Sequence, residues 1–242
     1  MTEMFSADQL LEMLNNGRLE MEGLVPWGSN YTFLVHICHE QGEIDAIYKP
    51  GKGERPLWDF EKGTLCLREQ AAYLVSEALS WHLVPPTVLR KGPQGRGSLQ
   101  HFVSHDPQEH YLTFQGQFID QIQQIALFDV IINNADRKSG HVLLGDDNRL
   151  WAIDHGVCFH TDYKLRTVIW EFAGETIPAN LVADLTAFQR CLEAADSEMY
   201  QQFCNLLTPQ EIAVLSGRVQ RLINRNIFPH PGPGRHYPWP LV

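Results

Sequence analysis

The alternation of hydrophobic and polar positions makes the first half of the chain read mainly as strands. Residues 30–50 (NYTFLVHICHEQGEIDAIYKP) place β-branched and aromatic residues on both sides of an EQG turn, which predicts two paired strands closed by Pro50. Residues 84–107 predict two more strands around a glycine-rich turn, followed by a connection that ends at a proline. Between these pairs, residues 64–83 have apolar positions at helical spacing and predict one long helix.

Helical patterns lie at the start of the chain and throughout its second half. Residues 6–17 (SADQLLEMLNNG) predict a short helix that begins at Ser6 or Asp8 and ends before Gly17. Residues 118–133 are apolar and helical, and residues 181–226 favour three further helices.

The last of these helices carries its own start signal. Thr208 and Glu211 have the spacing of a capping box, in which each side chain accepts a hydrogen bond from the backbone of the other residue. The tail after residue 227 is too rich in proline for regular structure. Together these patterns predict an α+β chain with a β-rich N-terminal lobe (residues 1–104) and a mainly helical C-terminal lobe (residues 105–242).

Composition and charge narrow the possible functions. Apolar residues make up 44% of the 242 positions, enough for a sizeable core, and the formal net charge of −10 argues against a broad nucleic-acid-binding surface. The five cysteines form no Cys-x-x-Cys pair, so we expect no disulfide framework and a cytoplasmic protein. No apolar run is long enough for a transmembrane helix, and the N-terminus is too acidic for a signal peptide.

Two carboxylates lie at the edges of apolar segments. Asp136 follows an apolar segment and has polar residues around it in the sequence. Asp154 lies at the end of a second apolar segment, two residues before Gly156. Because burying polar groups is costly, polar residues at the ends of buried segments usually have a function. Transfer of a phosphoryl group from ATP needs a cation on the phosphates, carboxylates for Mg²⁺ and a carboxylate beside the attacking hydroxyl. Lys49, Glu69, Asp136 and Asp154 supply these groups in the order found in protein kinases.

Five short motifs carry a more specific resemblance. They are, in chain order, AIYKP, REQAAYLVSEAL followed by VPPT, GSLQHFV, NNADRKSGHVLL and AIDHGVCF. With them the sequence resembles a small member of the phosphatidylinositol kinase-like superfamily, close to the type II phosphatidylinositol 4-kinases and the HipA-type bacterial kinases. The resemblance runs from about residue 23 to residue 159, and it implies a two-lobed protein-kinase-like fold that binds ATP with Mg²⁺ or Mn²⁺.

The resemblance also implies roles for individual residues. Lys49 contacts the ATP phosphates, and Glu69 holds Lys49, with Glu77 as the other candidate for this role. Asp136 is the catalytic aspartate, and Arg137 lies beside it in the catalytic loop. Asp154 binds the metal ion, together with His141, which stands where the family usually has an asparagine. The remaining cofactor-binding residues are expected near the adenine ring (Gln100, His101, Phe102, Val103) and in a reduced phosphate-binding loop (Gly28, Ser29, Asn30).

The expected activity is transfer of the γ-phosphoryl group of ATP to a hydroxyl. The acceptor is a protein serine or threonine, an inositol lipid or a small metabolite, and the lack of a basic amphipathic face argues against a membrane lipid. One alternative is a kinase-like module that binds nucleotide, or a partner, without turnover, motivated by His141 and the sparse glycine loop. Another is a metal-dependent hydrolase built from a set of five acidic and histidine residues (Asp136, His141, Asp154, His155, His160).

Several other residues are expected to serve structure alone. His155 and His160 are better explained as structural histidines than as ligands, and Cys158 as a small buried apolar residue. The remaining expectation is that five tryptophans pack in the core or between the lobes (Trp27, Trp58, Trp81, Trp151, Trp170).

Overall fold

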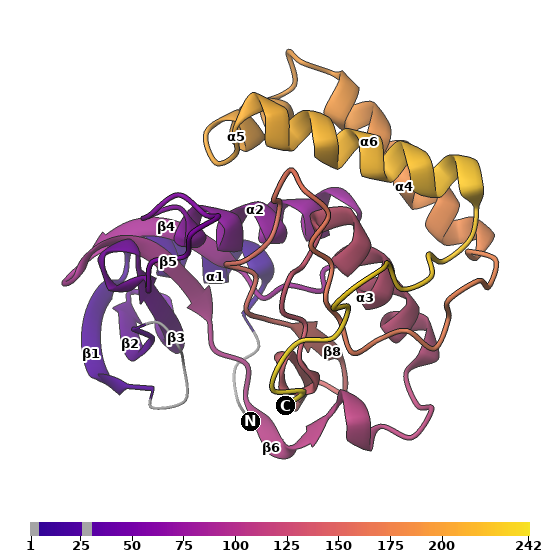
Figure 1. Ribbon diagram of the computed structural model, residues 1–242. Helices are drawn as coiled ribbons and strands as arrows, with labels where there is room; N and C mark the ends of the chain where they lie inside the picture. Colours follow the sequence, from indigo (N-terminus) through magenta and orange to yellow (C-terminus); the bar gives the residue numbers. More distant parts are fainter. Residues whose placement is uncertain (1–4, 26–30) are drawn as a thin grey trace.

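The computed structural model describes residues 5–25 and 31–242. Trp27 and the expected phosphate-binding loop of Gly28, Ser29 and Asn30 lie outside these residues, so their predicted roles stay predictions. Within the described residues the architecture is α+β, with an antiparallel sheet first and a mainly helical region after it (Figure 1).

The N-terminal sheet has five antiparallel strands in the order β1-β2-β3-β5-β4. Strand β3 is central, and its Lys49 lies opposite Ser98 on β5. Because side chains alternate between the two faces of a strand, Tyr48 and Lys49 point to opposite sides of the sheet. The strands are β1 (Arg18–Leu24), β2 (Phe33–His39), β3 (Gly42–Pro50), β4 (Thr87–Gly92) and β5 (Gly95–His101).

One face of this sheet is covered by helix α1 (Ala7–Asn16). Its Met13 and Leu14 are completely buried in a cluster that includes Tyr48. Ser6 begins the helix and forms a capping box with Gln9, which confirms Ser6 rather than Asp8 as the start. The opposite face of the sheet carries Lys49 and forms part of the candidate functional site.

Helix α2 (Leu65–Ala78) connects the sheet to the second core. It ends five residues earlier than the pattern predicts, because Ser80 and His82 adopt left-handed backbone angles, φ 57° and 50°. The Ser76 hydroxyl accepts hydrogen bonds from the backbone N–H groups of Leu83 and Val84, so the chain turns toward β4 at this point.

The C-terminal region combines four helices with a small sheet. Its core surrounds helix α3, whose Phe128, Ile131 and Ile132 are completely buried. Thr208 and Glu211 form the expected capping box on α6. The helices are α3 (Ile119–Ile132), α4 (Ala179–Glu193), α5 (Glu198–Cys204) and α6 (Pro209–Arg225), and the sheet order is β6 (His105–His110), β7 (Val142–Gly145) and β8 (Leu150–Ala152). Short 3₁₀ turns cover Gly51–Gly53, Tyr111–Thr113 and Ser139–His141.

The structure corrects some expectations. Strands β1 and β6 were not predicted, because their side chains are mostly exposed and show no apolar face. The packing role expected for Trp58 is wrong: the residue is 93% exposed, and Lys164 Nζ lies 5.1 Å from its ring centre. Trp81 is buried as expected, and Trp151 and Trp170 are half-buried.

The tail after α6 carries no helix or strand beyond residue 227, as expected. Figure 1 shows it running back past α3 to end near β8. The Leu241 carbonyl accepts a hydrogen bond from Ser139 N–H at 2.8 Å. The end of the chain therefore contacts the loop that carries Asp136.

Candidate active site

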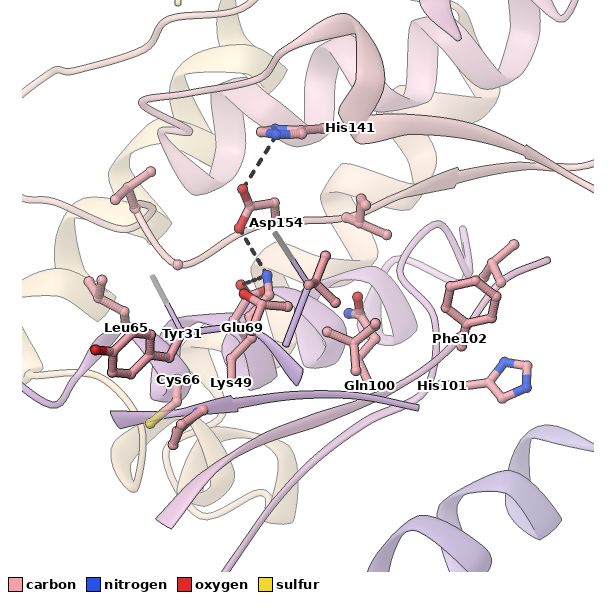
Figure 2. A pocket seen from close by; sticks show the side chains of 18 of the residues that line it. Tyr31, Lys49, Leu65, Cys66, Glu69, Gln100, His101, Phe102, His141 and Asp154 are labelled. Carbon is pink, nitrogen blue, oxygen red and sulfur yellow. Dashed lines mark hydrogen bonds and ion pairs between the residues drawn. The ribbon is translucent and has the colours of Figure 1, made fainter. Parts of the chain in front are cut away.

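A cavity of about 290 Å³ lies between the Lys49 face of the sheet and the loops around β7 and β8 (Figure 2). It brings together most of the residues that the sequence singled out, from segments far apart in the chain. Those among its lining residues are Lys49, Glu69, Gln100, His101, Phe102, Val103, Asp136, His141 and Asp154.

Lys49 lies between two carboxylates. Its Nζ is 2.5 Å from Glu69 Oε1 and 2.9 Å from Asp154 Oδ1. Burial alone lowers the pKa of Lys49, but the negative charges of Asp154 and Glu69 more than offset it and hold the pKa above its usual value. The ammonium group is therefore charged at neutral pH and available to an anion in the cavity.

Glu69 is held by α2 and by the segment that follows Asp154. Its side chain is 4% exposed, and Oε2 accepts a hydrogen bond from His155 N–H at 2.9 Å. The sequence left open whether this residue faces solvent, and the structure shows that it is buried in the site. Glu77, the other candidate, pairs with His82.

Asp154 follows strand β8 and has a left-handed backbone conformation, φ 63°. Aspartate tolerates this conformation better than most residues. The positive charge of Lys49 lowers the pKa of Asp154 well below its usual range, against the opposing effect of burial. The carboxylate is therefore ionised, with Oδ1 bound to Lys49 and Oδ2 3.4 Å from His141 Nε2.

The ring nitrogen Nε2 of His141 faces the carboxylate of Asp154. Its Nδ1 lies 3.0 Å from the backbone carbonyl oxygen of Asp136 and 3.5 Å from the backbone nitrogen of Lys138, and we assign the proton to Nδ1 because the shorter contact is to a group that can only accept. Burial lowers the pKa of His141 to about 4, so the ring is neutral at pH 7. The two facing atoms, Nε2 and Asp154 Oδ2, are then both acceptors, an arrangement that fits a divalent cation bound by one nitrogen and one oxygen.

Asp136 lies on the other side of His141, in the loop after α3. Its backbone N–H donates to Asn134 Oδ1, and its Oδ2 is 3.4 Å from Lys138 Nζ. Burial raises the pKa of Asp136 above its usual value, against the opposing charge of Lys138. The side chain is one-third exposed, at 34%, so it can contact a second molecule at the mouth of the cavity.

Arg137 is completely buried and does not face the cavity. Its Nε donates to both oxygens of Asp129, and Nη1 donates to the carbonyls of His141 and Ile153. These bonds hold the segment that carries His141 beside the segment that carries Asp154, so the arginine fixes their separation rather than touching a substrate.

The far end of the cavity lies at the end of β5. Gln100 is buried and donates from Nε2 to Thr87 Oγ1 at 2.8 Å, while Phe102 N–H donates to the Asp45 carbonyl. Four apolar residues also line the cavity, and apolar walls of this kind suit a flat ring (Val25, Ile47, Leu143, Ile153). These four residues were not predicted from the sequence, although Ile47 lies two positions before Lys49 and therefore on the same face of β3.

The histidines proposed for a hydrolase are not brought together. His155 Nε2 accepts from the buried guanidinium of Arg137 at 2.7 Å, and His160 lies against Phe60. Among the described residues, no three of the five candidate ligands have donor atoms that all lie within 4.8 Å of one another; of these atoms, His141 Nε2 and Asp154 Oδ2 form a close pair, 3.4 Å apart. The geometry supports the expectation that His155 and His160 are structural, and the thiol of Cys158 is buried as expected.

Comparisons with solved structures support the fold. The Golgi casein kinase with Mn/ADP bound superposes with a TM-score of 0.59 at 15% identity, over 90% of this chain and 74% of that one. Hydra Fam20 with sugar superposes with a TM-score of 0.53 at 11% identity, over 90% of this chain and 88% of that one. At such low identity these matches establish a protein-kinase-like fold alone.

Comparisons with known sequences show the family as well as the fold. Protein Rv2133c of Mycobacterium tuberculosis is 36% identical over 94% of this chain and 94% of its own length. Phosphatidylinositol 4-kinase gamma 4 of Oryza sativa is 32% identical over 45% of this chain, which spans only 22% of that protein. The family described as phosphatidylinositol 3- and 4-kinase matches residues 20–210, most of the chain and all of the cavity's principal charged residues. The chain therefore belongs to the phosphatidylinositol 3- and 4-kinase family.

Proposed function

We propose that this protein is an ATP-dependent kinase that transfers the γ-phosphoryl group to a hydroxyl. The observation that carries the proposal is the position of Lys49 Nζ, 2.5 Å from Glu69 and 2.9 Å from Asp154 inside the cavity. A charged lysine fixed by one carboxylate and adjacent to a second, metal-binding carboxylate is the arrangement that positions nucleotide phosphates in kinases.

The two ends of the cavity suit the two ends of ATP. The segment from Gln100 to Val103, with the four apolar wall residues, takes the adenine ring, and Lys49 takes the phosphates. Asp154 and His141 hold Mg²⁺ or Mn²⁺, which when bound neutralises negative charge on the phosphates. The loop of Gly28, Ser29 and Asn30 remains our proposal for further phosphate contacts from backbone N–H groups.

Asp136 is proposed to act on the acceptor. Its carboxylate orients the hydroxyl and takes its proton as the hydroxyl oxygen bonds to the γ-phosphorus and the bond to the β-phosphate oxygen breaks. Arg137 contributes by positioning, since its guanidinium holds the backbone at His141 and Ile153 and does not face the cavity.

We favour a protein or small-molecule acceptor over a membrane lipid. The names of the similar proteins include both a casein kinase and phosphatidylinositol 4-kinases. The net charge of −10 disfavours approach to an anionic membrane, and none of the described helices is long and apolar enough to cross one.

All five cysteines are free, which supports a reducing compartment such as the cytosol.

Radiolabelled ATP would test the activity and the acceptor together. Purified protein is incubated with ATP and Mg²⁺ or Mn²⁺, and label transfer is compared among casein, phosphatidylinositol vesicles and small polyols. We expect transfer to a protein or small molecule that falls by about 10²–10⁴-fold in Asp136→Asn. Nucleotide binding without any ADP formation would instead favour the non-catalytic module, which the histidine at position 141 motivates.

A further inference from the structure

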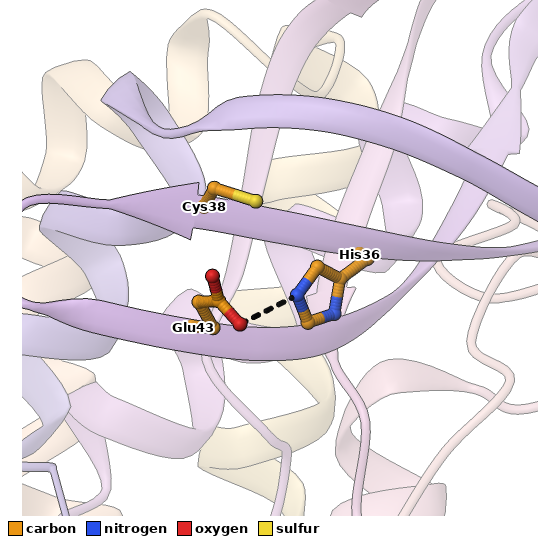
Figure 3. Close-up of side chains that lie close together, drawn as sticks. All are labelled: His36, Cys38 and Glu43. Atoms are coloured by element: carbon orange, nitrogen blue, oxygen red, sulfur yellow. Dashed lines mark hydrogen bonds and ion pairs between the residues drawn. The ribbon is translucent and has the colours of Figure 1, made fainter.

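The outer part of the same sheet face carries a second group of metal-ligating side chains, away from Lys49. His36 and Cys38 are two positions apart on β2, and Glu43 lies opposite Cys38 on β3. Their ligand atoms lie within 4.8 Å of one another (Figure 3). Residues at this spacing on paired strands share one face, so the backbone of two neighbouring strands holds the three side chains together.

His36 is oriented by a second carboxylate. Asp45 lies opposite His36 in the β2–β3 register, and its Oδ1 is 2.9 Å from His36 Nδ1. Glu43 Oε2 lies 3.3 Å from His36 Nε2, so a cation that replaces the Nε2 proton would meet the imidazole and the Glu43 carboxylate together while Nδ1–H stays on Asp45. A carboxylate on one ring nitrogen that directs the other nitrogen at a cation is the usual environment of a metal-bound histidine.

We propose that His36, Cys38 and Glu43 form a binding site for Zn²⁺, separate from the nucleotide site. A thiolate with an imidazole and a carboxylate suits Zn²⁺, whereas Mg²⁺ prefers oxygen ligands alone. Binding replaces the proton of the Cys38 thiol and the proton on His36 Nε2 with bonds to the metal, and both protons are released to solvent. All three side chains reach solvent, Cys38 and His36 being half-buried and Glu43 exposed, so an ion can enter and water can complete its coordination.

The site would connect β2 to β3 close to the cavity. Along β3, Glu43 and Asp45 share a face with Ile47 and Lys49, which line the cavity. The Asp45 carbonyl accepts from Phe102 N–H at 3.0 Å, so the strand that carries the site is bonded to the chain segment at the adenine end. The proposal does not depend on kinase activity, and its test needs no nucleotide.

Cobalt is the probe, because Co²⁺ occupies zinc sites and absorbs light. We expect one equivalent of Co²⁺, added to the reduced full-length protein without nucleotide, to give a sulfur-to-cobalt charge-transfer band that Zn²⁺ abolishes. Cys38→Ser should remove the band, whereas the matched control Cys204→Ser, at an exposed cysteine on α5, should keep it. His36→Gln and Glu43→Gln should each weaken binding by about 10-fold or more.

The alternative is that His36, as an imidazolium, simply pairs with Asp45 and Glu43. The proposal is overturned if the wild-type protein gives no cobalt–sulfur band, or if Cys38→Ser leaves the band unchanged. Asp154→Asn separates this site from the nucleotide site: the band should persist in that variant, and its loss would place the thiolate-bound ion in the nucleotide cavity and contradict the assignment.

Discussion

Arg68 on α2 and Glu211 on α6 form a buried ion pair, with Arg68 Nη2 2.6 Å from Glu211 Oε1. The same guanidinium donates to the Cys158 carbonyl at 2.7 Å. Arg68 therefore fixes the helix that carries Glu69 both to the C-terminal helices and to the segment after Asp154. Helix α2 is held in the position that brings Glu69 to Lys49.

Removing one member of this pair should destabilise the fold. Arg68→Gln leaves Glu211 buried without its partner, and we expect a loss of about 3–5 kcal/mol in the free energy of unfolding. Urea denaturation measures it. The matched control is Arg18→Gln, which breaks the exposed pair with Glu20 on β1 and should change stability by less than about 1 kcal/mol. Equal effects in both variants would contradict a special role for Arg68.

Glu211 should also make stability depend on pH. Burial raises its pKa, but hydrogen bonds from Thr208 and the charge of Arg68 more than offset this, so the pKa in the folded protein lies below its usual value. This stabilisation is present above the unfolded-state pKa and is lost as pH falls through the lower folded-state pKa. Unfolding measured between about pH 5 and pH 3 should therefore show a smaller loss of stability for Glu211→Gln than for the wild type.

Lys49→Met should affect both turnover and stability. Loss of the ammonium removes the contact to phosphate, and it also leaves Glu69, at 4% side-chain exposure, without its cation. We expect turnover to be nearly abolished and stability to fall by about 1–3 kcal/mol. The double variant Lys49→Met/Glu69→Gln should recover stability but not turnover. If Lys49→Met retains full turnover, the lysine has been assigned wrongly.

The two aspartates should fail in different ways. Asp154→Asn should weaken metal-dependent nucleotide binding together with turnover, because it removes the charge beside His141 and Lys49. Asp136→Asn should leave binding nearly intact while transfer drops by about 10²–10⁴-fold. Calorimetric titration with Mg-ATP, in parallel with the transfer assay, separates the two. An equal loss of binding in both variants would refute the division of roles.

His141→Asn should change the metal preference. A neutral imidazole favours ions softer than Mg²⁺, whereas an amide oxygen suits Mg²⁺. We expect the ratio of kcat/KM with Mn²⁺ to that with Mg²⁺ to fall in the variant. His82→Asn, at an exposed histidine that pairs with Glu77, is the control and should leave the ratio unchanged. An unaltered ratio in both variants would remove His141 from the metal site.

The sequence alone determined much of the architecture, because local patterns carry it. Period-two alternation placed β2 and β3, helical spacing placed α3 and the three C-terminal helices, and Thr208 with Glu211 marked the start of α6. Strands β1 and β6 could not be predicted, because most of their side chains are exposed and show no apolar alternation. They are strands because their backbones hydrogen-bond to neighbouring strands that are distant in sequence. The boundary between lobes at residues 104 and 105 stays a prediction.

The candidate site, like the fold, could be predicted from the sequence only in part. Motif order pointed to Lys49, Asp136 and Asp154, but only the fold decided that Glu69, and not Glu77, meets Lys49. Only the fold showed that Arg137 is buried behind the site. A helical wheel cannot foretell which polar residue faces a cleft formed by another lobe, because that contact joins residues distant in sequence. Tertiary packing makes such contacts, and here it does so through the Arg68–Glu211 pair that sets the position of α2.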